Sequence, residues 1–146
     1  MIISQYMTPE HRECDTLYAQ AESFVASNDW QQAKEAYLKF ADETLLHFKK
    51  EEEDLFPAFE QQTGGAEGPT KVMRFEHEQV RGLLGKMAEA VENSDKDAFL
   101  SLGESIMILL QQHNMKEEQM LYAMCDRVIG KEQREDLIAK MDQESL

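Results

Sequence analysis

The sequence predicts an all-α protein: an antiparallel up-down-up-down four-helix bundle followed by a short C-terminal helix. Apolar residues recur at spacings of three and four over most of the chain, and no alternating strand pattern of useful length is present. Turn-forming clusters divide the sequence into four long segments with short connections, which is typical of such bundles. At 146 residues we expect one domain over 1–146, with the bundle at about 8–127 and an extension at about 131–142.

Helix-start and turn signals define the first half of the bundle. Thr8 followed by Pro9 predicts an N-cap and a first-turn proline for a helix over about 8–26. The Ser-Asn-Asp run at 27–29 predicts a turn and a new cap. A second helix should then cover about 30–62.

Proline, glycine and further turn signals divide the rest of the chain. Pro57 should kink the second helix or end its regular part, since proline removes an internal hydrogen bond. The glycine-rich segment 63–69 is the clearest helix breaker in the chain. A third helix is expected over about 70–92, a turn at 93–95, and a fourth helix over about 96–127.

Bulk composition excludes several classes of protein. The net charge of −14 and the isoelectric point near 4.6 argue against binding to nucleic acid, which needs clustered Lys and Arg. The amino-terminal segment lacks the basic and apolar regions of a signal peptide, and no run of about 18 apolar residues predicts a membrane span. We therefore expect a soluble cytoplasmic protein that has no nucleic-acid or membrane partner.

Each predicted helix carries one apolar stripe, and each stripe contains one of the four histidines. Glu51 and Glu117 also fall within stripes, four residues after His47 and His113. The first stripe comprises His11, Cys14, Tyr18, Ala21 and Val25, and the second Ala33, Tyr37, Phe40, Thr44, His47, Glu51 and Leu55. The third comprises Met73, His77, Val80, Leu84, Met87 and Val91, and the fourth Phe99, Leu102, Ile106, Leu110, His113, Glu117, Leu121 and Met124.

The spacing of the histidines predicts that they lie at one height. His11 and His47 are 36 residues apart, and so are His77 and His113. Two residues of an antiparallel hairpin are level when its turn lies at their midpoint. The midpoints of successive histidines are positions 29, 62 and 95, which all fall at or beside predicted turns. Neighbouring helices pack with axes about 8–10 Å apart, so four inward imidazoles can meet.

Glu51 and Glu117 add two carboxylates to the same interior layer. An ionised carboxylate there costs several kcal/mol unless it is paired or metal-bound. No Lys or Arg lies in the core stripes near this level, so the compensating cation must come from outside. A dinuclear metal centre fits this donor set, since each carboxylate is able to bridge two ions.

Mixed imidazole and carboxylate ligation favours iron or manganese over structural zinc, which prefers tetrahedral sites rich in Cys or His. Two iron ions are therefore the expected cofactor, with manganese or zinc less favoured. Six protein ligands leave coordination positions for an oxo bridge and for dioxygen, peroxide or nitric oxide.

The ordered set His11, His47-x-x-x-Glu51, His77 and His113-x-x-x-Glu117 resembles the hemerythrin-like (HHE cation-binding) family, in its four-His, two-Glu form. The resemblance covers about Thr8 to Arg127, and the order of the motifs is highly specific. It implies a non-haem di-iron site with His11 and His47 on one iron and His77 and His113 on the other. Glu51 and Glu117 would bridge the two ions.

The chain departs from the oxygen-carrying hemerythrins. Those proteins have a fifth histidine in a His-x-x-x-His pair on the third helix, but here the residues four before and after His77 are Met73 and Arg81. They also have an Asp five residues after the last histidine; here Glu117 precedes that position, and Glu118 stands at it as a possible substitute. The ligand set is more similar to the iron-sensing and iron-centre-repair branches.

These features favour a di-iron module that binds or senses iron, dioxygen or nitric oxide, in iron handling or a stress response. The alternatives are a di-iron enzyme acting on peroxide or nitric oxide, an oxygen carrier, and a purely structural metal site. An enzyme should also show a substrate pocket and an acid or base beside the metal. Tyr18 and Tyr37 are candidate inward donors, although core aromatic residues are equally ordinary at their positions.

The two cysteines test the predicted heights. Cys14 lies three residues beyond His11, towards the first turn, whereas Cys125 lies twelve residues beyond His113, towards the opposite end. This places them far beyond the limit of about 7 Å between Cα atoms for a disulfide. We predict two free thiols.

Overall fold

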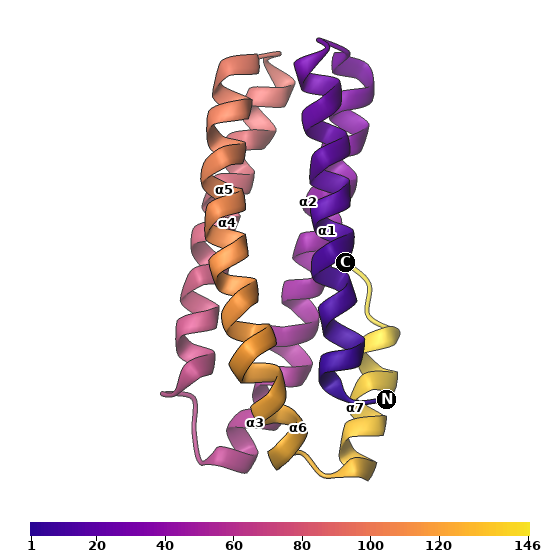
Figure 1. Cartoon of the computed structure of the whole chain (residues 1–146), viewed down its shortest axis with the longest axis vertical. Helices are drawn as coiled ribbons and strands as arrows, with labels where there is room; N and C mark the ends of the chain where they lie inside the picture. The colour runs from indigo at the N-terminus through magenta and orange to yellow at the C-terminus, as the bar shows by residue number, and fades with distance from the viewer.

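The computed structural model describes residues 1–146 and shows an all-α helical bundle with no strand, as predicted. The four long helices run side by side, and Figure 1 shows that each is antiparallel to the next in the chain. They are α1 (Ile3–Ala26), α2 (Trp30–Lys50), α4 (Pro69–Glu92) and α5 (Lys96–Lys116). The shorter elements are η1 (Glu51–Leu55), α3 (Phe56–Thr63), η2 (Glu117–Leu121), α6 (Tyr122–Val128) and α7 (Lys131–Asp142).

The start predicted for the first helix is wrong. Helix α1 begins at Ile3, and Pro9 lies inside it rather than in its first turn. The carboxylate of Asp126, in α6, accepts hydrogen bonds from the backbone N–H groups of Ile3 and Ser4 at 2.6 and 3.2 Å. This carboxylate satisfies donors that the helix cannot satisfy itself. The contact spans more than 120 residues, so no local signal indicates it.

Two π turns interrupt the helices that the sequence predicts as continuous. In η1 the N–H of Phe56 bonds to the carbonyl of Glu51, and in η2 the N–H of Tyr122 bonds to that of Glu117. Both bonds span five residues, one more than in an α-helix. The irregularity expected at Pro57 therefore begins earlier, and the break at η2 was not predicted. Each π turn starts at an inward glutamate.

The two hairpins have matching turns. Asn28 and Ser94 take left-handed backbone conformations, with φ of 59° and 51°. Asp29 then accepts a hydrogen bond from the N–H of Gln32, and Asp95 accepts the equivalent bond from Ala98. Every residue of the first turn corresponds to one 66 positions later, as do η1 and η2. The chain thus repeats one helical hairpin, and the expected turns are confirmed.

The predicted stripes form the core, with only Leu102 and Met124 half-buried. The core has two parts. The upper core packs around Phe40, Phe99 and Ile106 near the two matching turns, and the lower core around Leu55, Phe59 and Tyr122 among the short helices. A layer of buried polar side chains lies between them.

Three further features complete the fold. Helix α7 packs beside α1 and η1, where Lys140 pairs with Asp54 at 3.0 Å. Cys14 belongs to the upper core and Cys125 to the lower core, and both are free thiols, as predicted. None of the helices combines the length and apolar character needed to cross a membrane.

Candidate metal centre

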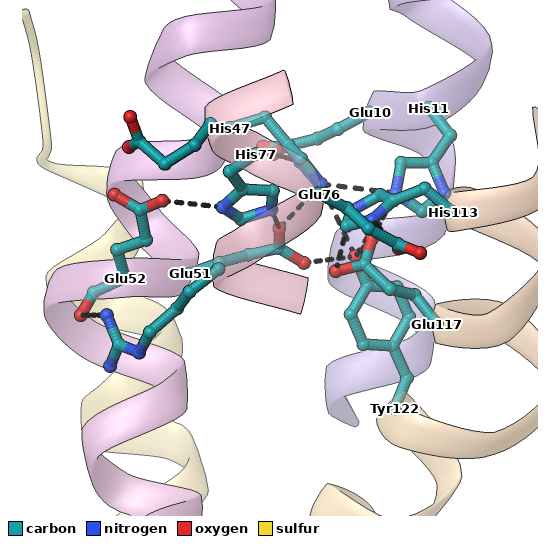
Figure 2. Close-up of polar contacts among 12 residues, drawn as sticks. Glu10, His11, His47, Glu51, Glu52, Glu76, His77, His113, Glu117 and Tyr122 are labelled. Carbon is teal, nitrogen blue, oxygen red and sulfur yellow. Dashed lines mark hydrogen bonds and ion pairs between the residues drawn. The ribbon is translucent and has the colours of Figure 1, made fainter. Parts of the chain in front are cut away.

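The buried polar layer contains all four histidines and both inward glutamates. These residues come from α1, α2, η1, α4, α5 and η2, and their side chains point towards one another in the bundle interior (Figure 2). Each is at most 4% exposed. The residues are His11, His47, Glu51, His77, His113 and Glu117. The single height predicted from the midpoint argument is therefore what the fold produces.

One half of the layer is built around His11 and His47. Their Nε2 atoms lie 3.1 Å apart, and Oε1 of Glu117 lies 3.0 Å from Nε2 of His11 and 3.8 Å from that of His47. Oε1 of Glu51 lies 3.5 Å from Nε2 of His47. Three donor groups from separate helices thus face one point.

The other half is built around His77 and His113. Oε1 of Glu51 lies 3.1 Å from Nε2 of His77, and Oε2 of Glu117 lies 3.4 Å from Nε2 of His113. Ligand atoms of all four residues lie within 4.8 Å of one another. Since Glu117 turns one oxygen to each half, the two groups share it.

Four atoms in this layer test whether it fits a metal. Nε2 of His77, Nε2 of His113, Oε1 of Glu51 and Oε2 of Glu117 are buried and have no hydrogen-bond partner. Buried polar atoms are nearly always paired, because leaving one unpaired costs about 1–3 kcal/mol. All four are nitrogen or oxygen donors facing the same space. The donor chemistry fits a cation with imidazole and carboxylate ligands.

A second ring of carboxylates fixes the orientation of the imidazoles. Each Nδ1 atom donates to a glutamate of another helix, which leaves Nε2 to face the interior. The pairs are His11 with Glu118 at 2.7 Å, His47 with Glu10 at 2.8 Å, His77 with Glu52 at 2.6 Å and His113 with Glu76 at 2.8 Å. Figure 2 shows Glu10, Glu52 and Glu76 around the inner cluster.

Comparison with known proteins agrees with this geometry. The family model described as the hemerythrin HHE cation binding domain matches residues 3–125. The chain belongs to this hemerythrin family. No curated protein and no solved structure matches it. The matched range contains every histidine and glutamate of the buried layer, which supports cation binding there.

The basic residues nearest the buried layer of this hemerythrin domain bind its outer carboxylates. Lys50 donates to Glu10 at 2.6 Å, and Lys116 donates to Glu76. The only ion-pair partners of Glu51 and Glu117 are histidines. In the absence of a bound ion, only protonated histidines can balance the negative charges of Glu51 and Glu117.

The pKa values express this charge balance. Burial opposes a charge on His47, but Glu51, Glu10 and Glu117 outweigh it and hold its pKa well above the usual value. Burial also opposes a charge on His113, yet Glu117 and nearby carboxylates raise its pKa to about 9. Burial would raise the pKa of Glu117, but its histidine neighbours lower that pKa well below the usual range. In the metal-free protein the surrounding carboxylates therefore favour the protonated forms of His47 and His113.

Sequence reasoning missed two parts of the hemerythrin site. Tyr122, 0% exposed, places its hydroxyl in the inner cluster, whereas the candidates Tyr18 and Tyr37 bond to Glu22 and to the carbonyl of Leu84 instead. The outer glutamates were also missed, although each adjoins an inner residue in sequence. Glu118, considered as a substitute for Glu117, belongs to that outer ring.

Proposed function

We propose that this hemerythrin-like domain binds two iron ions in its buried layer. His11 and His47 hold one ion, His77 and His113 hold the other, and Glu51 and Glu117 bridge them. Both glutamates face both histidine pairs, since Glu51 lies 3.5 Å from His47 and 3.1 Å from His77 through the same oxygen. This arrangement supports two adjacent ions rather than one.

The observation that carries the proposal is the set of four unpaired buried donor atoms on Glu51, His77, His113 and Glu117. Two carboxylates without a Lys or Arg partner are costly in a low-dielectric interior. A divalent or trivalent cation removes that cost and satisfies all four atoms. Iron suits imidazole and carboxylate donors, whereas structural zinc prefers Cys-rich or His-rich tetrahedral sites.

The role we propose is binding or sensing of iron and small diatomic ligands such as dioxygen or nitric oxide, in iron handling or a stress response. The largest surface pocket, of about 740 Å³, is lined by residues such as Tyr18 and Ile108 and by none of the six inner residues. An apolar pocket of about 160 Å³ has Met73 and Leu121 in its wall. It too is lined by none of the six inner residues, so neither pocket gives a bulky substrate direct access to them, which favours small ligands.

We further propose that residues 1–146 act as one domain in the cytoplasm. Contacts between distant parts of the chain support the single domain: Tyr6 of α1 bonds to Asp142 of α7 at 3.3 Å, and Lys140 pairs with Asp54. The buried free thiols Cys14 and Cys125 are in keeping with a reducing compartment.

Metal analysis after reconstitution tests the proposal. The purified chain is loaded anaerobically with ferrous iron, desalted and assayed for bound metal, in parallel with manganese and zinc. We expect two irons per chain and an optical spectrum that changes on adding dioxygen or nitric oxide. A chain that retains no iron overturns the proposed metal centre. If the chain binds two irons but its spectrum changes with neither dioxygen nor nitric oxide, the metal centre stands and the sensing role is overturned. Rapid turnover of peroxide would favour the di-iron enzyme instead.

A further inference from the structure

Tyr122 is the one aromatic hydroxyl within the inner cluster. It is 0% exposed and lies at the start of α6, directly after η2. Its hydroxyl oxygen is 2.7 Å from Oε2 of Glu51 and 3.0 Å from Oε1 of Glu117. The same oxygen is 3.2 and 3.3 Å from Nε2 of His11 and of His47. Figure 2 shows the ring rising towards these side chains from below.

Five of the contacts among these atoms are of hydrogen-bond length, and the same spacing also suits ligands around one ion. Four atoms are considered: the Tyr122 hydroxyl oxygen, Nε2 of His11 and of His47, and Oε1 of Glu117. The six distances among them run from 3.0 to 3.8 Å. A tetrahedron with edges of about 3.3 Å has its centre about 2.0 Å from each corner, and metal–nitrogen and metal–oxygen bonds have that length.

The other half of the cluster has no such hydroxyl. The residue 66 positions before Tyr122 is Phe56, whose ring stacks on His77 with centroids 5.7 Å apart. Phe48 stacks on another side of His77 at 3.8 Å. Phenyl rings donate nothing to a metal, so that half offers only Glu51, His77, His113 and Glu117. The repeated hairpin therefore differs between its two copies at the position of Tyr122.

We propose that Tyr122 is a direct ligand, through its phenolate oxygen, of the metal ion held by His11 and His47. This inference rests on the metal centre proposed above. Ligation forms a metal–oxygen bond and breaks the phenol O–H bond, and the proton passes to the solvent. The anionic oxygen makes this position a better site for ferric iron than the position at His77 and His113.

A phenolate bound to ferric iron has its own optical and vibrational signature, which tests the inference on the unmodified protein. The ferric-loaded chain is examined for a phenolate-to-iron charge-transfer band and for tyrosinate modes in resonance Raman spectra excited within it. We expect both signals. A chain that binds two irons without tyrosinate modes overturns the role of Tyr122 and leaves the metal centre standing; a chain that binds no iron overturns the metal centre itself.

Variants assign the signal to a residue. Tyr122→Phe should lose the charge-transfer band and the tyrosinate modes while metal analysis still finds at least one iron per chain. The matched control is Tyr37→Phe, since Tyr37 is also buried but its hydroxyl donates to the carbonyl of Leu84, away from the cluster. Tyr37→Phe should keep both signals. Persistence of the tyrosinate modes in Tyr122→Phe overturns the assignment, as does their loss in Tyr37→Phe.

Discussion

Nδ1 of His77 donates a hydrogen bond to Oε2 of Glu52 at 2.6 Å, and Arg81 binds the other oxygen of Glu52 at 2.7 Å. The carboxylate thus holds the imidazole in the tautomer that leaves Nε2 facing the cluster. Loss of such a partner typically lowers metal affinity by about 10–100-fold. We expect a loss of this size for Glu52→Gln, measured by competition with a chelator of known affinity.

The control for this variant is the neighbouring residue. Glu53 is exposed and contacts none of the histidines, so Glu53→Gln removes the same charge without touching the imidazole. It should bind metal as the parent does. Equal affinities for the two variants would show that Glu52 does not support the ligand.

Glu117→Gln should remove both metal ions together. Its oxygens face both halves of the cluster, 3.0 Å from Nε2 of His11 and 3.4 Å from Nε2 of His113. The expected result is less than one iron per chain and loss of the charge-transfer absorption; His47→Ala should also lose both. Glu118→Gln is the comparison, because Glu118 contacts only Nδ1 of His11 and should weaken binding without abolishing it. Retention of one full equivalent by Glu117→Gln would contradict a shared bridging ligand.

The metal-free protein should lose stability as the pH rises from about 6.5 to 9. The pKa of His113 is raised to about 9 in the folded state, where burial is outweighed by Glu117 and other carboxylates. A raised pKa stabilises the fold fully below the unfolded value, near 6.5, and that stabilisation is lost as the pH passes the folded value. For His113 the loss is about 3 kcal/mol at most, and His47 acts in the same direction.

Thermal unfolding followed by circular dichroism measures this effect, with a chelator present from pH 6 to 9.5. The iron-loaded protein should lack the decline, because bound metal replaces the protons on the imidazoles. A melting temperature of the metal-free protein that stays level or rises over this range would contradict the charge balance described for the cluster.

Gly103 makes room for Tyr18 in the upper core. A methyl group at Gly103 would overlap the Tyr18 hydroxyl and lie 2.9 Å from Cζ of its ring. We expect Gly103→Ala to cost about 1–3 kcal/mol of unfolding free energy, as overpacked cores do. Gly85→Ala, in an exposed stretch of α4 with nothing near its Cβ, should instead stabilise by about 0.5–1 kcal/mol. Urea denaturation compares the two, and equal effects would contradict the packing argument.

The height of the inner layer could be predicted from the sequence because it depends on regular features of the chain, namely the helical rise and the turns. Helical rise is constant and the turns at Asn28 and Ser94 are alike, so equal spacing of the histidines from the turns sets equal height. Inward orientation follows from the apolar stripe. The six inner residues therefore required only periodicity and turn signals.

The π turns, the inward position of Tyr122 and the outer glutamates could not be predicted, because no local sequence pattern indicates them. The π turns add one residue to a helical turn, yet no residue type in η2 requires this. Tyr122 follows Glu117 by five residues. In a regular α-helix, a side chain at that spacing points to a different side of the helix from Glu117. It points inward here because a π turn lies between the two residues. The outer glutamates are adjacent to inner residues, but with 29 acidic residues in the chain such adjacency carries little information.

The polar layer also bears on how the protein unfolds locally, because it separates two apolar cores. It divides the apolar interior into an upper core along the long helices and a lower core. The lower core lies among the shorter elements and the first turns of α1 and α4. We expect these cores to act as separate foldons in the metal-free protein, with amide hydrogen exchange finding the lower one opening at lower free energy. Such an opening would let an ion reach the buried histidines. An ion held by side chains from both hairpins would then link the two cores, and we expect them to unfold together in the metal-loaded protein.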